Sequence, residues 1–233
     1  MPARNSTKQY IENGYYHIYN RGVEKRVIFK DAQDYAVFLS YLKEYLTPKN
    51  EKELNDKLSD PDISYKERDK IIKLLRLNNF AEEITVLAYC LMPNHFHFFI
   101  KQKSPDSIDK FMNSLGTRYT MYFNKKHKRV GSLYQGVYKA ALVTNDEQFL
   151  HLSKYIHKQS LASQGQALRG YNQDGQPSSY LEYLGLRKTE WINPQEILSF
   201  FSNKNPSLSY ENFVLQTDET DILETSKIEE NED

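Results

Sequence analysis

Two short apolar segments, residues 84–91 and 95–101, constrain the fold most strongly, because only the tripeptide Met-Pro-Asn at 92–94 separates them. Each segment is rich in aliphatic and aromatic residues, each is too short for a typical helix, and the tripeptide is typical of a tight turn. Together they predict an antiparallel β-hairpin.

The two faces of the second predicted strand differ in chemistry. Alternate side chains of a strand project from opposite faces, so His95 and His97 share one face while Phe96 and Phe98 occupy the other, which we expect to face the core. Two imidazoles side by side on a rigid strand are suitable ligands for a divalent metal. The alternative is a polar strand face with two ordinary histidines, and an isolated His-x-His pattern does not decide between them.

The other predicted elements surround the hairpin in a regular order. They are a strand at residues 15–20, a helix from Asp31 to before Pro48, a helix at 105–130, a strand at 138–143 and a helix at 145–160. The order of strand, helix, strand, strand, helix, strand predicts an α+β, ferredoxin-like sandwich. We expect a central antiparallel sheet that carries the His-x-His strand, with helices on one face.

The chain divides into four regions by composition. Residues 1–14 form an N-terminal segment, and residues 15–162 form the main domain, interrupted by a charged insertion at 49–79 in which 65–77 predict a short polar helix. Residues 163–216 form an accessory region, with a linker rich in Gln, Gly and Asn, a small aromatic cluster and a last helix opened by Asn193-Pro194. Residues 217–233 have no apolar face and are expected to be a disordered acidic tail.

The formal net charge of zero conceals a separation of charges. The tail has eight acids against Lys227, whereas residues 101–140 have nine bases and two acids. A basic middle with interleaved aromatic residues suits a polyanion such as nucleic acid, although such a surface is also often merely solvated. One cysteine, a polar N-terminus and the lack of a long apolar stretch predict a cytoplasmic protein without membrane spans.

Several motifs in a consistent order carry a family resemblance. Residues 89–97, YCLMPNHFH, resemble the signature of the HUH single-tyrosine transposases. Residues 16–25, YHIYNRGVEK, resemble the opening strand of the REP-associated tyrosine transposases within that family, and 122–127, 131–136 and 178–180 resemble further parts of it. The resemblance spans about residues 15–200 and implies a transposase of the insertion-sequence type.

The resemblance also selects one tyrosine among 18. Tyr155 and Gln159 lie one turn apart on a predicted helix and share a face, but on spacing alone Tyr155 is better explained as a core residue beside Leu152 and Ile156. The family's nucleophile occupies the first position of a Tyr-Ile-x-x-Asn/Gln helix, which matches Tyr155. The residue four positions later supplies a third metal ligand in some branches, which matches Gln159, although many REP-associated members have Asn-Pro where this chain has Gln159-Ser160.

The family's chemistry gives expectations for cofactor and partner. The resemblance implies a DNA-nicking and rejoining enzyme that uses Mg²⁺ or Mn²⁺ at His95, His97 and Gln159, with a 5′-phosphotyrosine at Tyr155. Its DNA partner is expected to be single-stranded DNA with palindromic hairpins, and a homodimer is left open. The residues expected to contact DNA are Arg118, Lys125, Lys126, Lys128 and Arg129, through backbone phosphates, and Tyr134, through stacking on an unpaired base.

Three alternatives compete with this hypothesis. A replication initiator or relaxase shares the chemistry but needs further domains for which the chain has no room. A domesticated protein that binds DNA hairpins without cutting is the main rival, and the intact histidine pair and Tyr155 argue against it. A structural metal-binding module is disfavoured because two imidazoles and an amide are unlike the usual four-ligand structural zinc site. His151 and Lys158 are open candidates for the proton acceptor.

Overall fold

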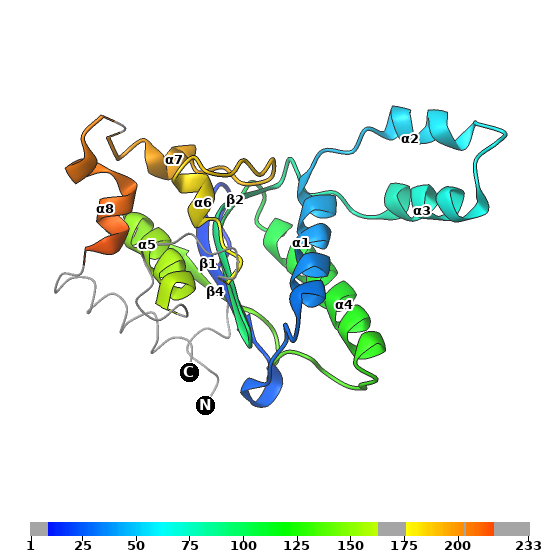
Figure 1. The fold of residues 1–233 in the computed structure, drawn as a ribbon, viewed down its shortest axis with the longest axis horizontal. Helices are drawn as coiled ribbons and strands as arrows, with labels where there is room; N and C mark the ends of the chain where they lie inside the picture. Colours follow the sequence, from blue (N-terminus) through cyan, green and yellow to red (C-terminus); the bar gives the residue numbers. More distant parts are fainter. Residues whose placement is uncertain (1–8, 163–175, 203, 217–233) are drawn as a thin grey trace.

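A four-stranded antiparallel sheet forms the centre of the computed structural model, which describes residues 9–162, 176–202 and 204–216 (Figure 1). Its strand order is β2-β3-β1-β4. The strands are β1 (Tyr15–Arg21), β2 (Ile84–Met92), β3 (His95–Gln102) and β4 (Lys139–Val143). This order, with a helix between β1 and β2 and another between β3 and β4, is the ferredoxin-like arrangement, so the predicted α+β class and the predicted hairpin are confirmed.

The described helices vary greatly in length. They are α1 (Ala32–Leu46), α2 (Glu51–Leu58), α3 (Tyr65–Arg76), α4 (Ser107–Lys126), α5 (Asp146–Ala162), α6 (Tyr180–Tyr183), α7 (Gln195–Leu198) and α8 (Tyr210–Leu215), with short 3-10 turns η1 (Val23–Lys25) and η2 (Pro206–Leu208). Asp31 caps α1 as expected, because its carboxylate accepts a hydrogen bond from the Asp34 backbone N–H at 3.0 Å.

One face of the sheet is covered by α1 and α4, which lie on the same side in Figure 1. Its core is apolar and strongly aromatic: Phe96 and Phe98 of β3 pack with Phe38 of α1 and with Phe111 and Tyr119 of α4. The predicted inward orientation of Phe96 and Phe98 is therefore confirmed.

The other face is covered by α5 and the C-terminal segment, so the expectation of helices on one face holds for α1 and α4 but is wrong for α5 (Figure 1). Leu152 and Ile156 of α5 pack against Cys90 of β2 and Phe99 of β3. The reason is the composition of the strands: β2 and β3 are apolar on both faces, and an apolar face must be covered.

Residues 176–216 close the β2 edge of the sheet. The Leu91 N–H donates to the Pro177 carbonyl at 2.8 Å and the Ser179 N–H donates to the Tyr89 carbonyl at 3.0 Å, so this segment pairs with the edge strand. The expected helix after Pro194 is present as α7, but it is not the last, because α8 follows and packs on α5.

The insertion forms an arm of two helices, α2 and α3, which projects away from the sheet (Figure 1). The sequence predicts α3 but not α2, because α2 has no buried residue and therefore no apolar stripe. Helix-capping side chains mark both starts: Asn50 accepts from the Glu53 N–H and Ser64 from the Glu67 N–H. The expectations for 163–175 and 217–233 lie outside the described residues. Among the described helices, none is long and apolar enough to cross a membrane.

Candidate functional site

The two predicted imidazoles lie together at the start of β3. The ring centroids of His95 and His97 are 4.8 Å apart, on the face opposite Phe96 and Phe98. His97 is fully buried, whereas His95 is only partly buried. The pair therefore opens toward the end of the sheet where β2 ends and β3 begins.

A third histidine, His17 of β1, belongs to the same cluster. Its Nε2 lies 3.0 Å from Nδ1 of His97, within hydrogen-bonding distance, and the two rings stack with centroids 5.2 Å apart. His17 was not among the predicted site residues, although the strand around it was predicted. The missing information was the register of β1 on β3, which sets Tyr19 opposite His97 and brings the side chain of His17 within reach.

The phenol of Tyr155 reaches this cluster from α5. Its ring centroid is 5.5 Å from that of His97 and 6.1 Å from that of His17, edge to face in both cases, and its side chain is 5% exposed. The contact is within one chain. Gln159 follows one turn later and is half-buried; within the described residues it forms no hydrogen bond with either imidazole.

All three imidazoles are held in the neutral form. Burial lowers the pKa of His17 to about 3, and burial with the nearby Arg21 cation lowers the pKa of His95 to about 4. Burial, with smaller contributions from His17 and His95, holds the pKa of His97 well below its ordinary value. Neutral imidazole is the form that binds metals.

A buried polar network fixes α5 over β2. His157 forms hydrogen bonds through Nε2 with Ser179 Oγ at 2.8 Å and through Nδ1 with Tyr210 Oη at 2.6 Å. Ser179 Oγ in turn accepts a hydrogen bond from the Tyr89 backbone N–H at 2.9 Å. The C-terminal segment therefore holds the helix that carries Tyr155 in position.

Two of the residues expected to contact DNA form ion pairs within the fold. Arg118 forms an ion pair with Glu44 at 2.6 Å and lies 3.8 Å over the Tyr41 ring, which ties α4 to α1. Lys126 forms ion pairs with Asp31 and with buried Asp34.

Tyr134 is also placed differently from the expectation. Its hydroxyl is buried without a hydrogen-bond partner among the described residues, and its ring packs 5.9 Å from that of Phe96. Tyr134 is half-buried and packs against the edge of the core, so its stacking on a base stays a prediction. A sequence shows the type of a side chain but not whether a turn carries it inward.

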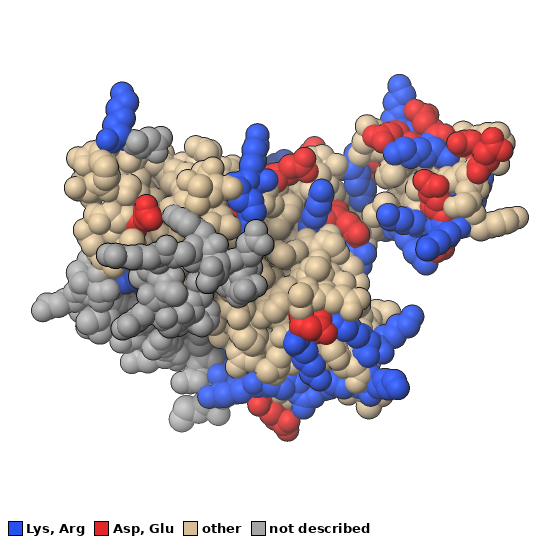
Figure 2. All heavy atoms as spheres, viewed as in Figure 1, with Lys and Arg blue, Asp and Glu red and all other residues tan. Residues whose placement is uncertain are grey.

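The other expected DNA contacts remain accessible. Lys125 and Lys128 are exposed and Arg129 is half-buried. The cations of Arg129 and Lys30 both lie within 6 Å of the Phe123 ring centroid, so they neighbour one another. We call these four residues the basic edge; Figure 2 shows Lys and Arg gathered over this end of α4.

Two further cations border the histidine cluster and were not predicted. Arg21 lies opposite His95 in the β1–β3 register and donates from Nε to Gln135 at 2.7 Å. The Lys139 ammonium lies 5.6 Å from the Tyr19 ring, which itself stacks 6.2 Å from His97. Both come from strand ends at the same end of the sheet as His95.

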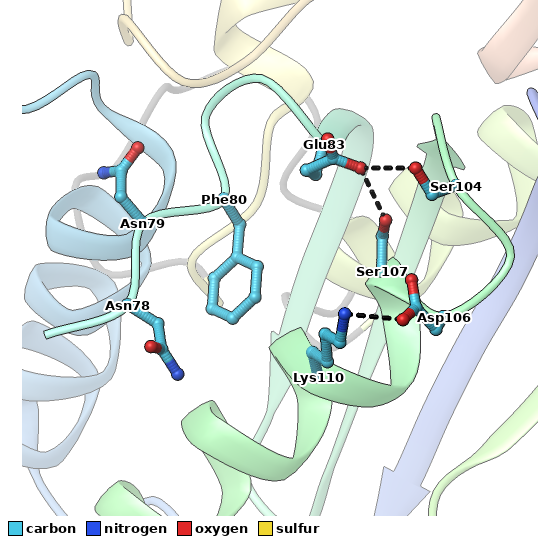
Figure 3. Close-up of a pocket in the computed structure, with 8 residues that line it drawn as sticks. All are labelled: Asn78, Asn79, Phe80, Glu83, Ser104, Asp106, Ser107 and Lys110. Carbon is cyan, nitrogen blue, oxygen red and sulfur yellow. Dashed lines mark hydrogen bonds and ion pairs between the residues drawn. The ribbon is translucent and has the colours of Figure 1, made fainter.

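A cavity of about 590 Å³ lies at the opposite end of the sheet, near the start of α4 (Figure 3). Its Glu83 carboxylate accepts hydrogen bonds from the Ser104 and Ser107 hydroxyls at 2.9 and 2.8 Å, which hold the pKa of Glu83 below its ordinary value. Asp106 there forms an ion pair with Lys110. Both acids are therefore paired within the fold, and the cavity lies away from the histidine cluster. In the part of the chain that is described, no three His, Cys, Asp or Glu side chains form a metal-binding group.

Comparison with known proteins adds a family. Residues 59–159 match the family model described as IS200-like transposase, a segment that contains the histidine pair and Tyr155. A REP-associated tyrosine transposase solved bound to a REP hairpin is similar in structure, with a TM-score of 0.45, 12% identity and coverage of 80% of this chain and 90% of that one. A candidate transposase from Deinococcus radiodurans R1 has a TM-score of 0.35, 11% identity and coverage of 66% and 95%. No curated protein matches the chain.

The family match supports one class of protein. Residues 59–159, a little under half of the chain, are similar to IS200-like transposases, and this match bears out the resemblance to single-tyrosine transposases found in the sequence. Both TM-scores are below 0.5, so only the family match supports this class of protein.

Proposed function

We propose that this chain is a single-tyrosine transposase of the REP-associated type, which nicks and rejoins single-stranded DNA through a 5′-phosphotyrosine at Tyr155. The observation that carries the proposal is the 5.5 Å contact between the rings of Tyr155 and His97. On spacing alone Tyr155 is better explained as a core residue, and its side chain is buried; the imidazole of His97 beside it supports the role of a reactive phenol.

The proposed step exchanges one ester for another. The Tyr155 oxygen attacks the scissile phosphorus, the bond from phosphorus to the 3′ oxygen breaks, the phenol gives up its proton and the leaving 3′ oxygen gains one. The phosphotyrosine keeps the energy of the phosphodiester, so a second 3′-hydroxyl reverses the step and joins new ends without ATP. Lys158, one open candidate for the proton acceptor, donates to the Gln216 carbonyl at 2.9 Å, and His151 packs on Phe213. Neither contact points to that role.

His95, His97 and Gln159 are the residues that would hold Mg²⁺ or Mn²⁺. Such a metal, when bound, polarises a phosphate oxygen and orients the phosphate for in-line attack. The neutral imidazoles support this assignment. His17 fits a supporting role: if His97 donates its Nδ1–H to His17 Nε2, the Nε2 lone pair of His97 is left to face a metal.

DNA is proposed to approach from the end of the sheet where His95 lies. Arg21 and Lys139 border the site there, and the basic edge provides phosphate contacts without reading sequence. A DNA hairpin is the substrate that the sequence motifs imply. The histidines and Tyr155 meet within one chain, which supports a reaction site assembled from a single copy. In this proposal residues 15–162 form the catalytic domain and 163–216 support it.

The test is a covalent adduct. The purified chain is incubated with Mn²⁺ and a labelled single strand containing a hairpin, and a DNA-linked band resistant to denaturant is expected. Tyr155→Phe should remove the band, since it deletes only the nucleophilic oxygen. Tyr122→Phe is the matched control, because its hydroxyl donates to Asp34 on the other side of the sheet. Binding without any adduct would favour the domesticated, non-cutting alternative, and an adduct that survives in Tyr155→Phe would refute the assignment.

A further inference from the structure

The arm and the helical layer together form a cleft of about 670 Å³. Its walls are α3 on one side and Glu44 of α1 with Arg118 of α4 on the other. The cleft is lined by residues of α1, α3 and α4, whereas Tyr155 lies on the α5 side of the sheet. The arm itself projects away from the sheet (Figure 1). The cleft is therefore separate from the proposed reaction site.

One face of α3 gives this cleft a strongly basic lining. Lys66, Lys70 and Lys73 follow at helical spacing, and Arg76 continues the lining. All four are exposed, and Figure 2 shows blue side chains along the underside of the arm. The only acid that α3 contributes to the lining is Asp69.

Most of these cations are not neutralised by the fold. Lys73 pairs with Asp69 at 2.5 Å and Arg118 with Glu44 at 2.6 Å, but Lys66, Lys70 and Arg76 make no ion pair with any other described residue. Like charges at i and i+4 destabilise a helix by about 0.2–0.5 kcal/mol per pair. Lys66 and Lys70 are such a pair, although Glu67 and Asp69 of the same helix lie three positions from Lys70 and Lys66, respectively.

We propose that this cleft binds the sugar-phosphate backbone of double-stranded DNA, namely the stem of a hairpin whose single-stranded flank enters the Tyr155 site. The inference rests on the proposed function for its substrate class. A duplex fits better than a single strand because proteins that hold single strands without sequence preference provide aromatic platforms for stacking. The lining of this cleft is charged and aliphatic, with Leu74 and Leu77 between the cations.

The proposal divides recognition between two surfaces. The basic edge would steer the strand to be cut, and the cleft on α3 would hold the folded part of the DNA at a distance. Backbone contacts of this kind add affinity and salt dependence, roughly 0.9 in the slope of log K against log salt for each phosphate neutralised on duplex DNA.

The test compares binding of two oligonucleotides by fluorescence anisotropy over a range of salt concentrations. One forms a hairpin with a short single-stranded flank, and the other has the same length without a stem. In the full chain, Lys66→Gln, Lys70→Gln and Arg76→Gln together should weaken hairpin binding by about ten-fold or more at moderate salt and reduce the salt slope by about 2 to 3, since up to three phosphate contacts are lost. Binding of the stemless strand should change by less than about two-fold, because it does not use these contacts.

The matched control removes three cations of the arm that do not line the cleft, with Lys52→Gln, Lys57→Gln and Arg68→Gln. It has the same net charge as the first variant and should bind the hairpin like the unchanged chain. A variant with the opposite sign, Asp69→Asn, removes an acid from the lining, releases Lys73 and should tighten hairpin binding. These substitutions are at exposed positions, so the far-ultraviolet circular dichroism should not change.

Equal losses in the two triple variants, or hairpin binding unaffected by the first, would overturn the cleft proposal. The Tyr155 adduct on the stemless strand at saturating DNA reports separately on the chemistry. If no adduct forms but the cleft variant loses hairpin binding selectively, the proposed nicking activity fails and the cleft proposal stands. If the adduct forms and the cleft variant binds normally, the reverse holds.

Discussion

The two faces of the sheet differ in what they bury. The face under α1 and α4 is mainly apolar and aromatic, and its buried carboxylate, Asp34, is paired with Lys126. The face under α5 buries three imidazoles, those of His17, His97 and His157, together with Ser179. Burying polar groups costs free energy unless their hydrogen bonds are satisfied, so a protein has little reason to place them there for stability alone. The three imidazoles on the second face agree with the proposal that this face carries the reaction site, whereas the first face mainly stabilises the fold.

The largest effects are expected when one residue on each face is shortened. Phe98→Ala should lower the free energy of unfolding by about 3–5 kcal/mol, because Phe98 is fully buried beside Phe38 and Phe96. Tyr155→Phe should change it by no more than about 1 kcal/mol, the value of one hydrogen bond, while removing the adduct. Urea unfolding and the adduct assay measure the two effects. Equal losses of stability would show that the faces are not divided in this way.

His17 gives the next largest expected effect. His17→Phe removes the hydrogen-bond acceptor for His97 and should weaken Mn²⁺ binding about 10- to 100-fold, as loss of a partner behind a metal ligand generally does. His17→Gln can still accept a hydrogen bond and should retain more affinity. Titration calorimetry measures binding, and nitrogen-15 spectra of the imidazoles report directly which nitrogen of His97 carries the proton. Unchanged spectra and affinity in His17→Phe would remove the supporting role.

Acid should affect the second face first. Burial lowers the pKa of His157 to about 3, so between about pH 6.5 and pH 3 the unfolded chain binds a proton at this residue that the folded chain does not. Stability therefore falls as the pH falls, by about 2 kcal/mol from His157 alone between pH 7.5 and pH 5. Urea unfolding at the two pH values should show a smaller difference in His157→Gln than in the unchanged chain. An equal difference would place the acid sensitivity elsewhere.

The smallest effect concerns the basic surfaces. Removing residues 217–233, with their eight acids, should leave the adduct reaction intact and strengthen nonspecific DNA binding at low salt, because those acids compete with phosphate for the basic residues. Anisotropy at low and moderate salt measures this, and the gain should diminish as salt screens the charges. Unchanged or weaker binding at low salt would contradict the expectation.

Sequence reasoning succeeded where the information was local. Some features depend only on a few neighbouring residues, namely the alternation of side chains in β3, the Asp31 cap and the helical spacing of α5. The strands, the main helices and the orientation of His95 and His97 could therefore be predicted. Tyr155 was selected by family resemblance, because its spacing alone favours a core residue. The structure places its ring beside His97, as the resemblance implied.

Sequence reasoning failed where the outcome depends on contacts between distant segments. The roles of His17 and His157 depend on strand register and on Ser179 and Tyr210, which are far away in the chain. Arg118 and Lys126 looked like free cations because their partners, Glu44 and Asp34, belong to another helix. The sequence-based expectation also placed all helices on one face of the sheet. Strands β2 and β3 are apolar on both faces, and this pattern requires a second covering layer, which α5 provides.

In the proposed mechanism, each polypeptide has one nucleophilic phenol beside its imidazoles, and this would limit how many DNA ends it can carry. A phenolic oxygen forms only one phosphoester, so each copy would hold a single end at any moment. Moving a segment that has two boundaries would then require either two molecules working together or one molecule that completes the first joining before it begins the second.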